Sequence, residues 1–126
     1  MKHTIIHTNN APEALGPYSQ AVSINGLVFC SGQIGIDPTT NSLSGDTVEL
    51  QAKQVMKNLE AVLNQAGTTF SKVVKCSIFL ADMDDFAAVN EIYGAYFPSN
   101  PPARETVAVR TLPKHCLVEI SCIAYV

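Results

Sequence analysis

The sequence predicts an α+β fold in which two helices cover one face of a single sheet. Three observations lead to this prediction. The expected elements run as strands, helix, strand, helix and strands, an order that favours helices gathered on one side. Two segments carry apolar residues at helical spacing, and the others alternate or form short apolar runs. The 126 residues suit one core, so we expect a single domain over residues 1–126.

The N-terminal part predicts a short strand followed by a hairpin. Residues 3–8 favour a short strand, and residues 11–20, with two prolines and a glycine, favour a loop. Asn25-Gly26 is the strongest two-residue hairpin signal in the chain. We expect it to join a strand near 19–24 to an apolar strand over 27–36, before a polar loop.

A helix is the clearest element of the chain. Asp46 and, three residues later, Glu49 form a capping-box pattern, and Gly67 supplies a stop signal. The residues between them keep one apolar stripe at helical spacing. This stripe consists of Val48, Ala52, Val55, Met56, Leu59, Val62, Leu63 and Ala66.

The second half predicts three more strands and a second helix. Residues 72–80 form the first strand, and the helix begins near Asp84 and ends before Pro98. Residues 104–110 and 117–125 are expected to be two strands around a Leu-Pro-Lys turn. The apolar side of the second helix consists of Phe86, Val89, Tyr93, Tyr96 and Phe97.

Both faces of the predicted strands are largely apolar, which points to self-association. Two helices can cover only one side of the sheet, and soluble monomers rarely leave such a patch exposed. We therefore expect a homo-oligomer. The two faces expected beneath the helices consist of Val118, Ile120, Cys122, Ala124 and Val126 in the last strand, and of Val74, Cys76, Ile78 and Leu80 in the strand at 72–80.

Composition excludes several classes of function. Eight Lys and Arg residues and a net charge of −3 disfavour nucleic acid as a partner. No apolar run approaches the roughly 18 residues of a membrane span, and the N-terminus does not resemble a signal peptide, so we expect a cytoplasmic protein. The four cysteines form no C-x-x-C pair and no metal-ligand spacing, which favours buried reduced thiols and no metal site.

Arg104 and Glu119 are the leading candidates for chemistry. Arg104 begins a strand and shares its face with Thr106, by the period of two. Its planar fork suits a carboxylate. Glu119, on a mostly apolar face, would stand across a cleft and orient water or exchange protons. The two side chains could equally pair with each other or with a neighbouring subunit.

Other candidates have ordinary structural alternatives. Tyr18 follows Gly16-Pro17 in a loop, so its hydroxyl could reach a cleft or its ring could join the core. Ser31-Gly32 follows an apolar stretch of strand, where glycine permits close approach to a ligand or marks a bulge. Asn90, near the apolar stripe of the second helix, is by pattern a surface or packing residue.

The chain as a whole resembles the RidA (YjgF) family of reactive-intermediate deaminases. The resemblance is carried by ALGPYSQAV at 14–22, LVFCSGQIGIDP at 27–38 and, near the C-terminus, PPARETVAVRTLPKHCLVEI at 101–120. It implies a chorismate-mutase-like fold and a homotrimer with intersubunit clefts and an inner barrel of sheets. It also implies hydrolysis of 2-iminobutanoate and 2-iminopropanoate, released by pyridoxal-phosphate-dependent dehydratases, to 2-keto acids and ammonia, without a metal or organic cofactor.

The resemblance also implies roles for individual residues. Arg104 would bind the substrate carboxylate and Glu119 would place or activate water, while the positions lining the same cleft are Tyr18, Ser31, Gly32 and Asn90. Glu105 and Thr106 depart from the small residue and cysteine typical of the family. We expect Glu105 to point away from Arg104, and the Thr106 backbone N–H to remain available to a carboxylate.

Two other functions compete with the enzyme. A regulatory protein could sense a small carboxylate in the same cleft without turning it over, and it would need Arg104 as well. An RNA-cleaving translation inhibitor, an activity of some relatives, is opposed by the acidic balance of the chain.

Overall fold

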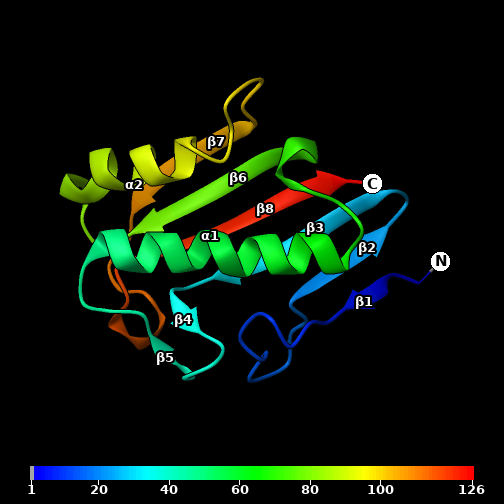
Figure 1. Ribbon diagram of the computed structural model, residues 1–126, viewed down its shortest axis with the longest axis horizontal. Coiled ribbons are helices and arrows are strands. Elements are labelled where there is room, and N and C mark those ends of the chain that lie inside the picture. The colour runs from blue at the N-terminus through cyan, green and yellow to red at the C-terminus, as the bar shows by residue number, and fades with distance from the viewer. Residues whose placement is uncertain (1) are drawn as a thin grey trace.

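A computed structural model describes residues 2–126 and confirms the α+β prediction (Figure 1). Six strands form one mixed sheet in the order β1-β2-β3-β8-β6-β7, and both helices lie on the same face of it. The strands of this sheet are β1 (Thr4–Ile6), β2 (Ala21–Ile24), β3 (Leu27–Gln33), β6 (Val73–Leu80), β7 (Ala103–Ala108) and β8 (Val118–Tyr125). The helices are α1 (Val48–Gln65) and α2 (Phe86–Gly94).

The hairpin predicted at Asn25-Gly26 joins β2 to β3. Both residues have positive φ, 53° and 77°, as a two-residue turn of this kind requires. The polar loop after β3 contains a feature that the sequence did not reveal. β4 (Ile36–Asp37) and β5 (Ser42–Leu43) pair there as a separate two-stranded ribbon.

Helix α1 begins one residue later than its capping pattern predicted. Thr47, not Asp46, is the N-cap, and its hydroxyl accepts a hydrogen bond from the Leu50 N–H at 3.2 Å. The stop signal is confirmed. Gly67 has φ 84°, and the Thr68 N–H returns to the Leu63 carbonyl at 3.0 Å, which closes the C-terminal turn.

The predicted strand faces hold except at two residues. Val74 was expected beneath the helices but is exposed, because a bulge between Val73 and Lys75 in the pairing with β8 turns Val73 inward instead. Val126 was expected on the same face but lies beyond the end of β8 and is exposed.

The last two strands are not neighbours in the sheet. β7 is an edge strand that pairs in parallel with β6, and β8 lies between β6 and β3. The connection from β6 through α2 to β7 is therefore a β–α–β crossover, which places α2 directly over this edge of the sheet.

Buried reduced cysteines are also confirmed. All four thiols are buried and free. Cys30, Cys122 and Cys76 lie at the same level of β3, β8 and β6, beneath the helices. Burial raises the pKa of the Cys76 thiol, and it also raises that of Cys116. These thiols are packing groups rather than nucleophiles.

The face of the sheet away from the helices keeps exposed apolar side chains. Leu27 and Phe29 of β3, Val107 of β7 and Tyr125 of β8 are each more than a third exposed. No helix within residues 2–126 is long and apolar enough to cross a membrane.

Candidate functional site

Arg104 lies on the helix-covered side of the sheet, against α2. One guanidinium nitrogen donates a hydrogen bond of 2.6 Å to Asn90 Oδ1. The guanidinium carbon lies 5.5 Å from the ring centre of Phe86 and 5.2 Å from that of Tyr93, so two aromatic residues of α2 support the cation. Neither ion pair formed among residues 2–126 involves Arg104. Its remaining donors therefore have no acid partner in the described chain.

Thr106 shares this face with Arg104, as predicted. Both side chains line a crevice together with Asn90, and the Thr106 hydroxyl is buried there without a hydrogen-bond partner. Glu105 points to the opposite face, as expected. It accepts a hydrogen bond from Ser77 and pairs with Lys75 at 3.0 Å, and these contacts together hold its pKa below the usual range. Glu105 therefore does not neutralise Arg104.

A second group of candidate residues surrounds a separate pocket of about 450 Å³, which we call the Glu119 pocket. It lies between the loop before β2, the end of β3 and the start of β8. Four of the predicted residues, from these three segments, line it. They are Tyr18, Ser31, Gly32 and Glu119.

Glu119 and Gly32 are in close contact. A Cβ placed on Gly32 would lie 2.8 Å from Glu119 Oε2 and 2.9 Å from its Cδ, so only glycine leaves room for this carboxyl group. Burial raises the pKa of Glu119 above its usual value. A carboxyl group with a raised pKa holds its proton to higher pH than an exposed one, which favours a role in proton exchange.

Ser31-Gly32 fits both of the alternatives that the sequence left open, whereas Tyr18 fits only one of its two. The strand is bulged between Cys30 and Gln33, and the residues of the bulge also line the pocket. The Ser31 hydroxyl donates to the Ser19 carbonyl at 2.6 Å, so it fixes the loop that carries Tyr18. Tyr18 is 54% exposed and lines the pocket, which excludes the core alternative.

The structure does not bring Arg104 and Glu119 together within one chain. Arg104 is level with Cys76, whose side chain is buried beneath the helices, whereas Glu119 is level with Phe79 on the other face. Since neighbouring strands present partnered residues to the same side, the two side chains leave opposite faces of the sheet. Direct pairing between them within a protomer is excluded.

Sequence reasoning missed several residues of the Glu119 pocket. Lys114 lines it from the turn before β8, where Lys114 and His115 have φ of 56° and 52°, a conformation uncommon for residues other than glycine. Gln20 and Leu15 line it from the loop. The only available signal was the closeness of these residues to Tyr18 and Glu119 in the sequence.

The described part of the chain contains no set of side chains arranged as metal ligands. No three His, Cys, Asp or Glu side chains of residues 2–126 are grouped so that they could hold an ion.

Comparisons with known proteins identify the family and the fold of the chain. The family model described as Endoribonuclease L-PSP matches residues 8–126. The human protein named 2-iminobutanoate/2-iminopropanoate deaminase is 48% identical over 95% of this chain and 88% of its own length. A crystal structure of a putative endoribonuclease L-PSP from Entamoeba histolytica is 50% identical, has a TM-score of 0.97, and the match covers 99% and 100% of the two chains.

A structure of TdcF from E. coli with bound serine is 38% identical, with a TM-score of 0.93 and 98% of each chain covered. The six-stranded sheet and its two helices are thus shared with these relatives. The chain belongs to the RidA/YjgF/L-PSP family.

Proposed function

We propose that this protein hydrolyses 2-iminobutanoate and 2-iminopropanoate, released by pyridoxal-phosphate-dependent dehydratases, to 2-keto acids and ammonia. The observation that carries the proposal is Arg104, a cation braced by Asn90 and two aromatic rings yet joined to no carboxylate of the described chain. A planar guanidinium in this state suits a small carboxylate. The name of the human relative and the serine bound to TdcF both fit a ligand of this size.

The reaction needs little apparatus beyond binding and proton transfer. Arg104 holds the carboxylate, which fixes the C=N carbon relative to water. Water adds to that carbon as the imine nitrogen takes up a proton, and the resulting carbinolamine loses ammonia as its hydroxyl proton leaves. Glu119, with its raised pKa, can take a proton from water and return it to the nitrogen. Tyr18 lines the same pocket as Glu119.

We propose that the working enzyme is a homotrimer in which two protomers complete each site. Arg104 and Glu119 leave opposite faces of one sheet, so a cleft that contains both requires two copies. The exposed apolar side chains on the helix-free face, among them Phe29 and Tyr125, give the copies a surface through which to associate.

The test is Arg104→Ala in an assay coupled to threonine dehydratase, with keto-acid release followed in time. Wild-type protein should accelerate keto-acid release, and we expect Arg104→Ala to lose this effect. The sedimentation coefficient of the variant should equal that of the wild type. Arg110→Ala, which removes an exposed arginine just beyond β7, is the matched control and should retain activity. Normal turnover by Arg104→Ala would refute the assigned role.

Mixing two inactive variants tests the shared site. Trimers reassembled from Arg104→Ala and Glu119→Ala protomers contain some interfaces with both side chains intact, so they should regain part of the activity. A mixture as inactive as its parents contradicts a site shared between protomers.

The same coupled assay separates the enzyme from a regulatory protein. A sensor that binds the carboxylate without turnover leaves the rate of keto-acid release unchanged when wild-type protein is added. RNA cleavage, which the family description names, gains no support from a chain with eight Lys and Arg residues and a net charge of −3.

A further inference from the structure

Two buried carboxamides hold the irregular backbone that lines the Glu119 pocket. Gln20 is 2% exposed and Asn58 is fully buried. Both side chains use their donors on backbone carbonyls of segments outside the main sheet and helices. Neither residue takes part in the chemistry proposed above.

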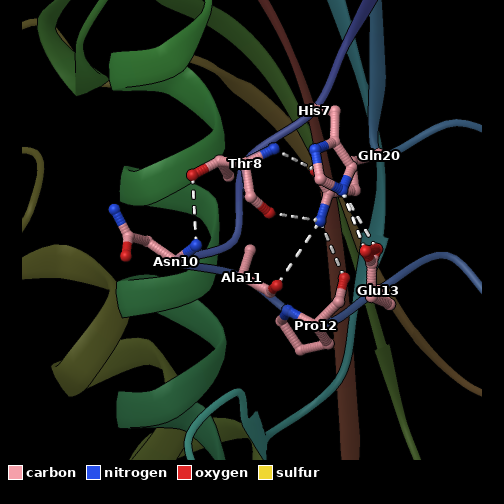
Figure 2. A network of polar contacts seen from close by, with 7 residues as sticks. All are labelled: His7, Thr8, Asn10, Ala11, Pro12, Glu13 and Gln20. Atoms are coloured by element: carbon pink, nitrogen blue, oxygen red, sulfur yellow. Dashed lines mark hydrogen bonds and ion pairs between the residues drawn. The ribbon is translucent and has the colours of Figure 1, made fainter.

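Gln20 clamps the segment that precedes the Tyr18 loop (Figure 2). Its Oε1 accepts a hydrogen bond from the Thr8 N–H at 2.7 Å, and its Nε2 donates to the carbonyls of Thr8 at 3.0 Å and Pro12 at 2.8 Å. Gln20 stands immediately before β2, so these bonds fix residues 8–12 to the sheet. Pro12 is part of the pocket lining, and this wall therefore depends on the clamp.

The loop that carries Tyr18 is held at its two ends, and near the first end His7 Nε2 also contacts the Glu13 carboxylate at 3.0 Å. At one end Gln20 holds Pro12, and at the other the Ser31 hydroxyl holds the Ser19 carbonyl. Between them the loop is exposed, and Leu15 is 74% exposed. Loss of the Gln20 contact would let the loop and Tyr18 move relative to Glu119.

Asn58 fixes the wall after β3. From α1 its Nδ2 donates to the carbonyls of Ile34 at 3.1 Å and Ile36 at 2.9 Å, and its Oδ1 accepts from Gln54 at 2.9 Å. Ile34 and Ile36 both line the Glu119 pocket. Both polar atoms of this carboxamide thus form hydrogen bonds, and two of these bonds go to residues that line the pocket.

We propose that Gln20 and Asn58 are positioning residues that hold the two walls of the Glu119 pocket in place before substrate binds. A binding site assembled in advance avoids the cost of ordering its loops on binding, and small displacements of reacting groups reduce rates steeply. The kinetic part of this proposal rests on the deaminase function proposed above.

The experiment compares Gln20→Met and Asn58→Leu with Thr68→Val. The first two keep approximate shape but remove the carboxamide. Thr68 is also buried, and its hydroxyl donates to the Tyr125 carbonyl at 2.6 Å, at the end of β8 remote from Glu119. We expect the two pocket variants to lower kcat/KM per folded molecule about tenfold. Thr68→Val should lose stability but change kcat/KM less than twofold.

Amide hydrogen exchange gives a readout that does not depend on activity. In the wild type the Thr8 amide, bonded to Gln20, should exchange far more slowly than the amide of exposed Leu15. In Gln20→Met, the Thr8 and Tyr18 amides should exchange at least tenfold faster, whereas Thr68→Val should leave both unchanged. Equal exchange of the Thr8 and Leu15 amides in the wild type overturns the proposal even if Gln20→Met does not fold.

The two proposals fail in different ways. If the wild type is inactive in the coupled assay, the deaminase function fails, and the exchange rates alone decide the role of the carboxamides. If the wild type is active and the pocket variants keep kcat/KM within twofold of Thr68→Val, the positioning role is wrong and the deaminase function stands.

Discussion

Replacing Gly32 by alanine is expected to damage activity while leaving the fold intact. The added methyl carbon would lie 2.8 Å from Glu119 Oε2, whereas ordinary contact begins near 3.4 Å, so the carboxyl group must move by at least about 0.6 Å. Gly32 does not have the positive φ that alanine resists, and the group that must move ends a flexible side chain. We therefore expect a loss of stability below about 1 kcal/mol. Because displacements near 1 Å can cost about a hundredfold in rate, kcat/KM should fall about tenfold.

The coupled dehydratase assay and urea unfolding measure the two quantities on the same samples. Gly32→Ala in a Glu119→Ala background is the control, because the shortened side chain leaves room for the methyl group. In that background, which already lacks the reacting carboxyl group, the glycine substitution should leave the free energy of unfolding unchanged. A single Gly32→Ala variant with kcat/KM within twofold of the wild type would refute the placement of Glu119 as a reacting group.

Three further substitutions test other parts of the structure. Burial raises the pKa of Glu119 above 4.5, so ionisation of this carboxyl group opposes folding. Glu119→Gln should therefore have a larger free energy of unfolding than the wild type at neutral pH. Urea unfolding should show this difference vanishing as the pH falls below about 4.5. Thr106→Val removes a buried hydroxyl without a partner and should raise the free energy of unfolding by about 1 kcal/mol in denaturant titrations. Gly35→Ala would place a methyl carbon 2.8 Å from the Gln51 backbone, so the same titrations should show a loss of about 1–3 kcal/mol.

Elements with a strong local signal were predictable from the sequence. The helical stripe from Val48 to Leu63 is buried throughout, and the turn at Asn25-Gly26 forms as expected. The N-cap shifted from Asp46 to Thr47 because two adjacent residues can both cap a helix, and sequence does not say which side chain reaches the free N–H groups. Bulges such as the one at Val74 depend on the partner strand and leave no local mark.

The candidate site was predictable as a set of residues but not as an arrangement. Asn90 meets Arg104, and Tyr18 shares a pocket with Glu119. The separation of the two groups could not be predicted, because it depends on β7 pairing in parallel with β6 rather than beside β8. Nothing in the sequence indicated the roles of Gln20 and Asn58, because their buried side-chain amides bond to backbone carbonyls far away in the sequence. No spacing of residue types indicates such bonds.

The separation of Arg104 from Glu119 has a kinetic consequence for the proposed enzyme. If Arg104 and Glu119 form the reaction centre as proposed, a single polypeptide, in which they emerge on opposite faces of the sheet, would lack a complete one. Only the assembled oligomer would then turn over substrate. Dilution below the dissociation constant of the oligomer should leave protomers that are folded but inactive. Specific activity would rise with protein concentration. After dilution, activity would decay with the rate constant of subunit dissociation.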